Sequence, residues 1–181
     1  MHRYAALLRG IAPSLPNMTN DKLRGVFEGL GFDAVASVLA SGNILFRCTE
    51  GSAPALERMI EGALARELGL SSRVIIRSQA ELRALVESDP FSVWTHGRGT
   101  YLTATFLKDA ATAVDLTPAD PALPTQIVRY DAAARAILAV TDNTAPGRTP
   151  DFMLWLEKQF GKGITTRAWP TIQRIVRKLE G

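Results

Sequence analysis

Three short polar runs in this chain combine residue types that bind anions. Arg9 precedes Gly10 at the end of an apolar segment, the run Ser41-Gly42-Asn43 precedes another, and Thr165-Thr166-Arg167 is followed by Trp169. An arginine side chain can hold two oxygens of a carboxylate or phosphate at once, and glycine-containing turns can aim several backbone N–H groups at one anion. We therefore expect an anion site wherever the fold brings these runs together.

Each run also has a purely structural interpretation. Arg9 could pair with a neighbouring carboxylate, and the residues of Ser41-Gly42-Asn43 tolerate the positive φ of a hairpin turn, which is the simpler account of that run. Thr166 and Arg167 lie where a last helix is expected to begin, so they could contact an anion there or cap the helix. Trp169 could offer a stacking face or fill space between helix and sheet. The sequence leaves these alternatives open.

The chain offers few groups for catalysis. Its histidines are His2, next to the chain start, and His96, which lies in a glycine-containing loop and could act as an acid or base, although a solvated loop histidine is the simpler interpretation. The histidines and the single cysteine, Cys48, do not have zinc-ligand spacing. The sequence lacks a P-loop, a dinucleotide-binding glycine pattern and a G-x-S-x-G turn. Catalytic residues and cofactors stay unassigned, and a carboxylate pair formed only by the fold stays open.

Length and composition are those of an ordinary globular chain. The 181 residues are 46% hydrophobic and 22% charged, enough for one domain or two small ones. A formal charge of +3 is too small to imply nucleic-acid binding by itself. The sequence has neither a signal-peptide pattern nor an apolar stretch of about 18 residues, and one cysteine cannot form an intramolecular disulfide. We expect a cytoplasmic protein without a membrane span.

Hydrophobic periodicity predicts the order β-α-β-β-α-β twice along the chain, which is the ferredoxin-like plan. The predicted strands are 4–9, 35–39, 44–48, 73–77, 100–107, 126–130, 136–141 and 164–166. The predicted helices are 20–30, capped by Thr19 or Asn20, then 56–68, 79–87, 110–116, 151–160 and a last one from Pro170. The stretch 117–125, with three prolines, is expected to be a surface loop.

The fold class predicted is therefore α+β, with two ferredoxin-like units, antiparallel sheets and a C-terminal helix. We expect residues 1–78 to form the first unit and 79–98 a linking helix and loop. Residues 99–181 are expected to form the second unit with the last helix. The two halves repeat the order of strands and helices, but they show no convincing repeat of sequence.

Several runs resemble a family of uncharacterised bacterial proteins, domain of unknown function 1697 (DUF1697). Its members carry a strand ending in LLRGI, a YLQSGNVVF-like run and TTRNWNT near the C-terminus, similar to 7–11, 41–46 and 165–169 here. Gly147-Arg148-Thr149 is similar to the family's GRSKL run and makes Arg148 a further candidate anion contact. The resemblance covers essentially the whole chain and implies two ferredoxin-like units and no settled activity.

The chain departs from that family in two places. Where members have a glycine- and lysine-bearing loop such as NVGGKNKV, this chain has Ala12-Pro13-Ser14-Leu15-Pro16-Asn17. The family's Asn-Trp-Asn is Ala168-Trp169-Pro170 here, so two carboxamides are missing. The candidate ligand-binding residues that remain are Arg9, Ser41, Gly42, Asn43, Arg148, Thr166, Arg167 and Trp169.

Three functions compete on these observations. The leading hypothesis is a binding protein without catalysis of its own, for an anionic ligand such as a nucleotide or a nucleic-acid segment, because arginines lie at element ends and catalytic groups are few. RNA binding through exposed strand aromatics is not expected, since the strands lack that pattern. The alternatives are an enzyme for a small phosphorylated or carboxylated metabolite and a structural or protein-interaction domain. The sequence does not indicate the ligand or the oligomeric state.

Overall fold

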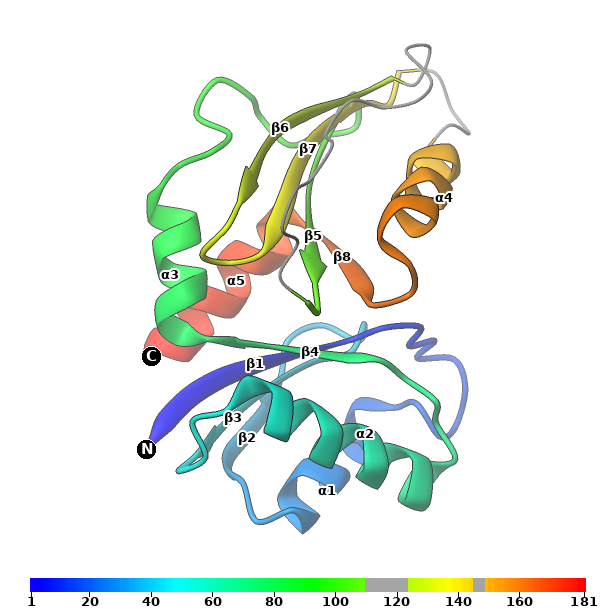
Figure 1. The fold of residues 1–181 in the computed structure, drawn as a ribbon, viewed down its shortest axis with the longest axis vertical. Coiled ribbons are helices and arrows are strands. Elements are labelled where there is room, and N and C mark those ends of the chain that lie inside the picture. Colours follow the sequence, from blue (N-terminus) through cyan, green and yellow to red (C-terminus); the bar gives the residue numbers. More distant parts are fainter. Residues whose placement is uncertain (110–123, 145–148) are drawn as a thin grey trace. The chain divides into compact units, whose positions relative to one another are not determined.

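The structure, a computed structural model, describes residues 1–109, 124–144 and 149–181. In these residues the chain forms two four-stranded antiparallel sheets with helices, which confirms the predicted fold class. The predicted helix 110–116 and the candidate Arg148 lie outside the described residues. The elements are β1 (His2–Leu8), α1 (Asn20–Gly29), β2 (Asp33–Ser37), β3 (Asn43–Cys48), α2 (Ala53–Leu68), β4 (Val74–Ser78), α3 (Gln79–Glu87), β5 (Thr100–Leu107), β6 (Thr125–Asp131), β7 (Ala136–Asp142), α4 (Thr149–Phe160), β8 (Ile164–Ala168) and α5 (Trp169–Glu180) (Figure 1).

The chain divides into two compact units. Unit 1 consists of Met1–Arg83 and Arg174–Gly181, and unit 2 of Ala84–Gln173. The strand order is β2-β3-β1-β4 in unit 1 and β6-β7-β5-β8 in unit 2, so the first strand of each unit is central and pairs antiparallel on both sides. The first boundary between the units falls within α3 and the second within α5. The end of α5 therefore belongs to unit 1, whereas the sequence assigned the whole last helix to the second half.

The two units repeat the same strand register although their sequences differ. Ala5 of β1 lies opposite Arg77 of β4, and Ala104 of β5 lies opposite Arg167 of β8. Four residues further along each first strand, a backbone N–H donates to the neighbouring strand, from Arg9 in unit 1 (2.9 Å) and from Lys108 in unit 2 (2.8 Å). The register thus makes Arg9 equivalent to Lys108, and Arg77 equivalent to Arg167.

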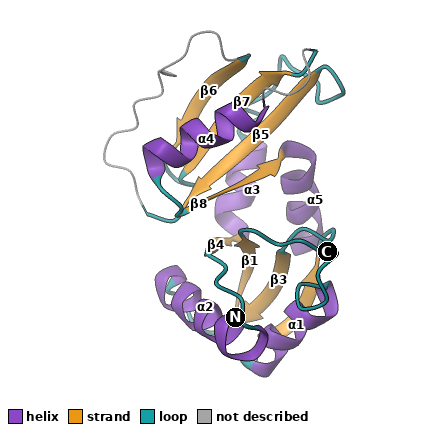
Figure 2. Cartoon of the chain, turned by 90° about the vertical axis from the view of Figure 1, so that its right-hand side faces the viewer, coloured by secondary structure: helices purple, strands orange, loops and turns teal. Residues whose placement is uncertain are grey.

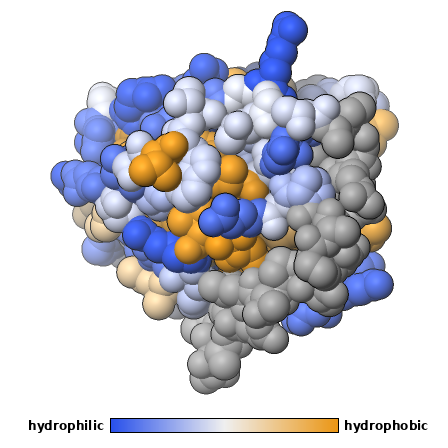
Figure 3. Space-filling view, turned by 90° about the horizontal axis from the view of Figure 1, so that it is seen from above, coloured by the Kyte–Doolittle hydropathy of each residue, from blue (hydrophilic) through white to orange (hydrophobic). Residues whose placement is uncertain are grey.

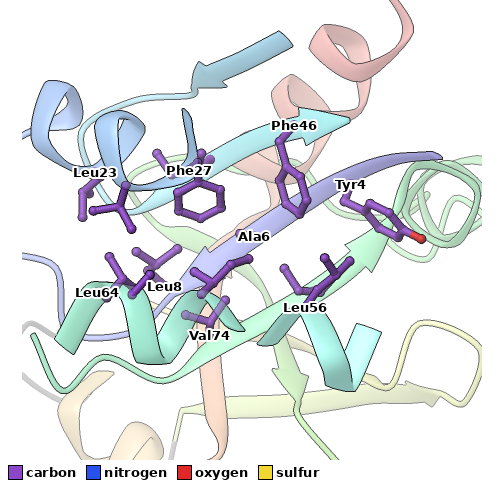
Figure 4. Close-up of a cluster of buried hydrophobic side chains, with 14 of the residues drawn as sticks. Tyr4, Ala6, Leu8, Leu23, Phe27, Phe46, Leu56, Leu64 and Val74 are labelled. Carbon is purple, nitrogen blue, oxygen red and sulfur yellow. The ribbon is translucent and has the colours of Figure 1, made fainter. Parts of the chain in front are cut away.

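The core of unit 1 lies between its sheet and the helices α1 and α2, which cover one face of that sheet (Figure 2). Tyr4, Ala6 and Leu8 point to this face because alternate residues of a strand share a side. Phe46 of β3 packs against Phe27 of α1 with 5.4 Å between ring centroids (Figure 4). Buried aromatic pairs of this kind anchor the helices on the sheet and so hold the ends of β1 and β3 in place.

Two helix ends in unit 1 carry local capping signals. Thr19 is the N-cap of α1, and its hydroxyl accepts from the Lys22 N–H (3.4 Å), which decides between the two predicted cap residues. Gly69 ends α2 in the left-handed conformation at φ 67°. Both signals are local, because they depend on a side-chain oxygen at one end and on a residue without Cβ at the other.

Carboxylates accept hydrogen bonds from the N–H groups on the outer edge of β4. This strand is last in its sheet, so alternate N–H groups point away from β1. Glu61 accepts from the Val74 N–H (2.9 Å) and Glu57 from the Ile76 N–H (3.0 Å), one turn apart on α2. Glu81 accepts from the next outward N–H, that of Ser78 (2.7 Å). These carboxylates occupy the donors with which a foreign strand would otherwise pair.

Several threonines lie beside the hydrophobic core of unit 2. The hydroxyls of Thr105 and Thr166 are 2.8 Å apart, and those of Thr125 and Thr141 are 3.0 Å apart, so each of these pairs shares a hydrogen bond. The hydroxyl of Thr103 is buried and has no hydrogen-bond partner in the described part of the chain. A buried hydroxyl without a partner lowers stability because it has lost its contact with water.

Thr103→Val is therefore expected to raise the free energy of unfolding by about 1 kcal/mol, because valine keeps the shape and removes the unpaired hydroxyl. Thr105→Val is the matched control. It should lower the free energy of unfolding by about 1 kcal/mol, since it takes the partner from Thr166. Urea denaturation followed by circular dichroism measures both, and equal losses in the two variants would contradict the prediction.

Candidate functional site

The structure brings two of the predicted runs together at one end of β1. The Leu8 N–H donates to the Gly42 carbonyl (2.8 Å). Gly42 has φ +78°, and a Cβ added there would lie 2.6 Å from Cγ1 of Ile11. Only glycine satisfies both conditions, the left-handed backbone and the close approach. The sequences LLRGI and SGN are therefore two sides of one contact.

Asn43 holds the turn that precedes β3. Its side chain is fully buried, and Nδ2 donates to the Val38 carbonyl (2.9 Å) and to the Ser41 hydroxyl (3.0 Å). The Val38 N–H in turn donates to the Asn43 carbonyl (2.9 Å). These contacts support the structural interpretation of the run for Asn43. Ser41 itself is exposed at the rim of the turn.

A second arginine joins Arg9 at this end of unit 1. Leu8 is paired with Val74, so continuing the register by one residue places Arg9 opposite Arg73, and the Arg9 N–H donates to the Arg73 carbonyl (2.9 Å). The Ser72 hydroxyl donates to the Arg9 carbonyl (2.8 Å). Arg73 was not among the predicted ligand residues, because its pairing with Arg9 spans more than sixty residues of sequence.

Arg167 is held by its own strand. Its Nη1 donates to the Thr165 hydroxyl (2.7 Å) and to the Thr166 carbonyl (3.0 Å). The equivalent Arg77 also donates from Nη1 to the carbonyl of the preceding residue, Ile76 (2.7 Å). Burial lowers the pKa of Arg167 to about 10, so the guanidinium stays charged at neutral pH. The repetition of this contact in both units supports a structural role for Arg167.

The other residues predicted around Arg167 are also engaged in packing. The hydroxyl of Thr166 pairs with that of Thr105. Trp169 is buried, and its ring lies edge-on against Phe91 with centroids 5.0 Å apart. This contact supports the packing interpretation of Trp169 over the stacking surface. Arg9, Ser41, Gly42 and Asn43 thus lie in unit 1, and Thr166, Arg167 and Trp169 in unit 2.

His96, the histidine considered as an acid or base, makes contacts within its own unit. Nδ1 of His96 accepts from the Leu102 N–H (3.1 Å), and its ring lies against Tyr101. Burial raises the pKa of the Cys48 thiol, which disfavours the reactive thiolate form. In the part of the chain that the structure describes, no three His, Cys, Asp or Glu residues could hold a metal ion, and no helix has the length and apolarity to span a membrane.

The end of unit 1 that gathers the two predicted runs lies within the part of the chain shared with a known family. The family described as "Protein of unknown function (DUF1697)" matches residues 1–132. The solved structure of the conserved bacterial protein SP0830 from Streptococcus pneumoniae has 20% sequence identity and a TM-score of 0.74, and the alignment covers 100% of this chain and 99% of that one. At this identity the likeness bears on the fold alone, and none of the curated proteins matches the chain. By the match over residues 1–132, this chain belongs to the DUF1697 family.

Proposed function

We propose that the protein binds an anionic ligand, a nucleotide or a nucleic-acid segment, without catalysing a reaction. The site lies at the end of unit 1 formed by Arg9, Arg73, Ser72 and the run Ser41-Gly42-Asn43, here called the Arg9–Arg73 end. The observation that carries the proposal is the cross-strand position of the two arginines. Opposite residues on neighbouring strands have their side chains on the same face, so both guanidinium groups can contact one anion.

The surroundings of the two arginines suit a phosphate or carboxylate. Two guanidinium groups can each supply a pair of parallel N–H donors. The exposed hydroxyl of Ser41 and the left-handed Gly10, at φ 73°, lie on segments that border Arg9.

The equivalent end of unit 2 is also basic, which supports the proposal. Lys108 is equivalent to Arg9, and its carbonyl accepts from Nη1 of Arg135 (3.2 Å). Arg135 takes the place of Gly42, since its carbonyl accepts from the Leu107 N–H (2.9 Å) and its φ is also positive, at 50°. Lys162 precedes the residue that pairs with Lys108. Each unit thus gathers cations where its first strand ends.

Arg9→Ala and Arg73→Ala are each expected to weaken the binding of ATP or of a short single-stranded oligonucleotide by about tenfold, because each removes one charge-assisted contact to phosphate. Fluorescence anisotropy of a labelled oligonucleotide, with ATP as competitor, measures both. Added salt should weaken binding, since exposed charges are screened.

Arg58→Ala is the matched control, because it removes an equal charge from an exposed position on α2. It should leave the affinity nearly unchanged. Adenosine, which has no phosphate, should not compete. The proposal fails if none of the phosphate probes binds, or if Arg58→Ala weakens binding as much as Arg9→Ala does.

A further inference from the structure

Unit 2 contains a hollow of about 570 Å³, and none of the predicted residues in the described part of the chain line it. It lies where β5 begins and β7 ends, and this volume is in the range of small-molecule sites. Seen from above, the surface shows an apolar patch surrounded by hydrophilic side chains (Figure 3), whereas the described lining of the hollow itself is mainly polar. The hollow is called the Asp142 hollow below and is defined by Trp94, Thr100, Gln126, Val140, Asp142 and Thr144.

Strand register explains how the floor of the hollow forms. Thr100 of β5 lies opposite Asp142 of β7, and Gln126 of β6 lies opposite Val140 of β7. Val140 and Asp142 are two residues apart, so all these side chains project from one face of the sheet. Ala139 packs in the core under α4. The neighbouring Val140 therefore belongs to the opposite face, which α4 leaves uncovered.

The Asp142 carboxylate is anchored at one oxygen. Its Oδ1 accepts from the Thr144 hydroxyl (2.6 Å) and from the Thr144 N–H (2.9 Å). These hydrogen bonds lower the pKa of Asp142, so the group is ionised at neutral pH. Oδ2 makes no hydrogen bond to any residue that the structure describes. A negative charge that is fixed through one oxygen therefore lies at the rim of the hollow.

The remaining lining residues complement a positive ligand. The indole of Trp94 is half-buried, with its ring approaching Phe91 nearly at a right angle. Indole is the aromatic group that attracts cations most strongly. Thr100 and Gln126 add oxygen acceptors. Among the described residues that line the hollow, Asp142 is the only charged one.

We propose that the Asp142 hollow binds a small organic cation, an alkylammonium or guanidinium group, with Asp142 as the counter-charge and Trp94 as the aromatic wall. Thr100 and Gln126 accept hydrogen bonds from the ligand. This site is independent of the Arg9–Arg73 end, whose ligand has the opposite charge. Failure of either proposal leaves the other intact.

Choline and agmatine are the probes for this site, titrated into ¹⁵N-labelled protein at millimolar concentrations and followed by NMR. Both are expected to shift the Trp94 indole signal and the amide signals of Thr100 and Asp142. Asp142→Asn should weaken binding by about tenfold or more, because it removes the counter-charge. Asparagine keeps Oδ1 as an acceptor for Thr144, so the turn is retained. Trp94→Leu should also weaken binding.

Asp109→Asn is the matched control, since it removes the same charge from an exposed residue near the other end of β5. It should leave the affinity for both probes unchanged. The uncharged isostere of choline, 3,3-dimethylbutanol, should bind at least about tenfold more weakly. The proposal is overturned if neither cation shifts these signals, if the uncharged alcohol or a neutral sugar binds as well, or if Asp109→Asn costs as much as Asp142→Asn.

Discussion

Gly42→Val is expected to lower the free energy of unfolding by about 3 kcal/mol. A left-handed backbone costs a residue with a side chain about 1–2 kcal/mol, and more for a β-branched one. The new Cβ would also lie 2.6 Å from Ile11 Cγ1 and 3.0 Å from Leu8 Cβ. Overpacking of that kind costs about 1–3 kcal/mol more. Urea denaturation followed by far-ultraviolet circular dichroism measures the loss.

Gly10→Val separates the two contributions. Gly10 has φ +73°, but nothing lies within 4 Å of a Cβ placed there, so only the backbone cost of about 1–2 kcal/mol applies. The difference between the two variants then reports the contact between the runs LLRGI and SGN. Equal losses would mean that Ile11 moves aside at little cost, and that the contact does not explain why glycine stands at position 42.

Glu57→Ala is expected to lower the free energy of unfolding by about 2–3 kcal/mol. The Glu57 carboxylate is buried and accepts from the Ile76 N–H (3.0 Å). Without the carboxylate, the buried Ile76 N–H has neither an acceptor nor water to bond with, and an unsatisfied buried donor costs about 1–3 kcal/mol. The variant should also aggregate more readily, because an open edge strand can pair with another chain. Chemical denaturation and light scattering test the two effects.

Two substitutions on α2 serve as controls for Glu57→Ala. Glu57→Gln keeps a side-chain oxygen for the Ile76 N–H, so its loss should be about half as large or less. Glu67→Ala removes an exposed carboxylate whose contact with Arg66 is a surface ion pair, worth about 0–1 kcal/mol. If Glu67→Ala were as damaging as Glu57→Ala, the edge of β4 would not be what Glu57 stabilises.

Much of the fold could be predicted because its signals are local. The apolar period of β1, the Thr19 cap and the glycine at the end of α2 each depend on a few neighbouring residues. The predicted end of the last strand was two residues short, at Thr166 in place of Ala168. The sequence places Arg167 at the start of a helix, whereas in the structure its backbone pairs with Ala104 of β5 and extends β8. Such pairing depends on a partner more than sixty residues away.

The candidate site was less predictable than the fold. The sequence singled out Arg9 and Ser41-Gly42-Asn43, and the structure brings them together with Arg73. It also shows Trp169 packed against Phe91, where the sequence left stacking and packing open. The Asp142 hollow had no sequence signal, since Thr100, Gln126 and Asp142 are ordinary strand residues until three strands align them.

By itself the sequence determined the order of elements, the α+β class and the left-handed glycines, because hydrophobic period and backbone freedom act between near neighbours. Only the tertiary structure decided which polar residues meet. Register sets Arg9 against Arg73 and makes Arg167 the counterpart of Arg77, and the fold brings Ile11 close to Gly42. These facts depend on which strands pair and with what offset, and that choice is made by the packing of whole sheets and helices.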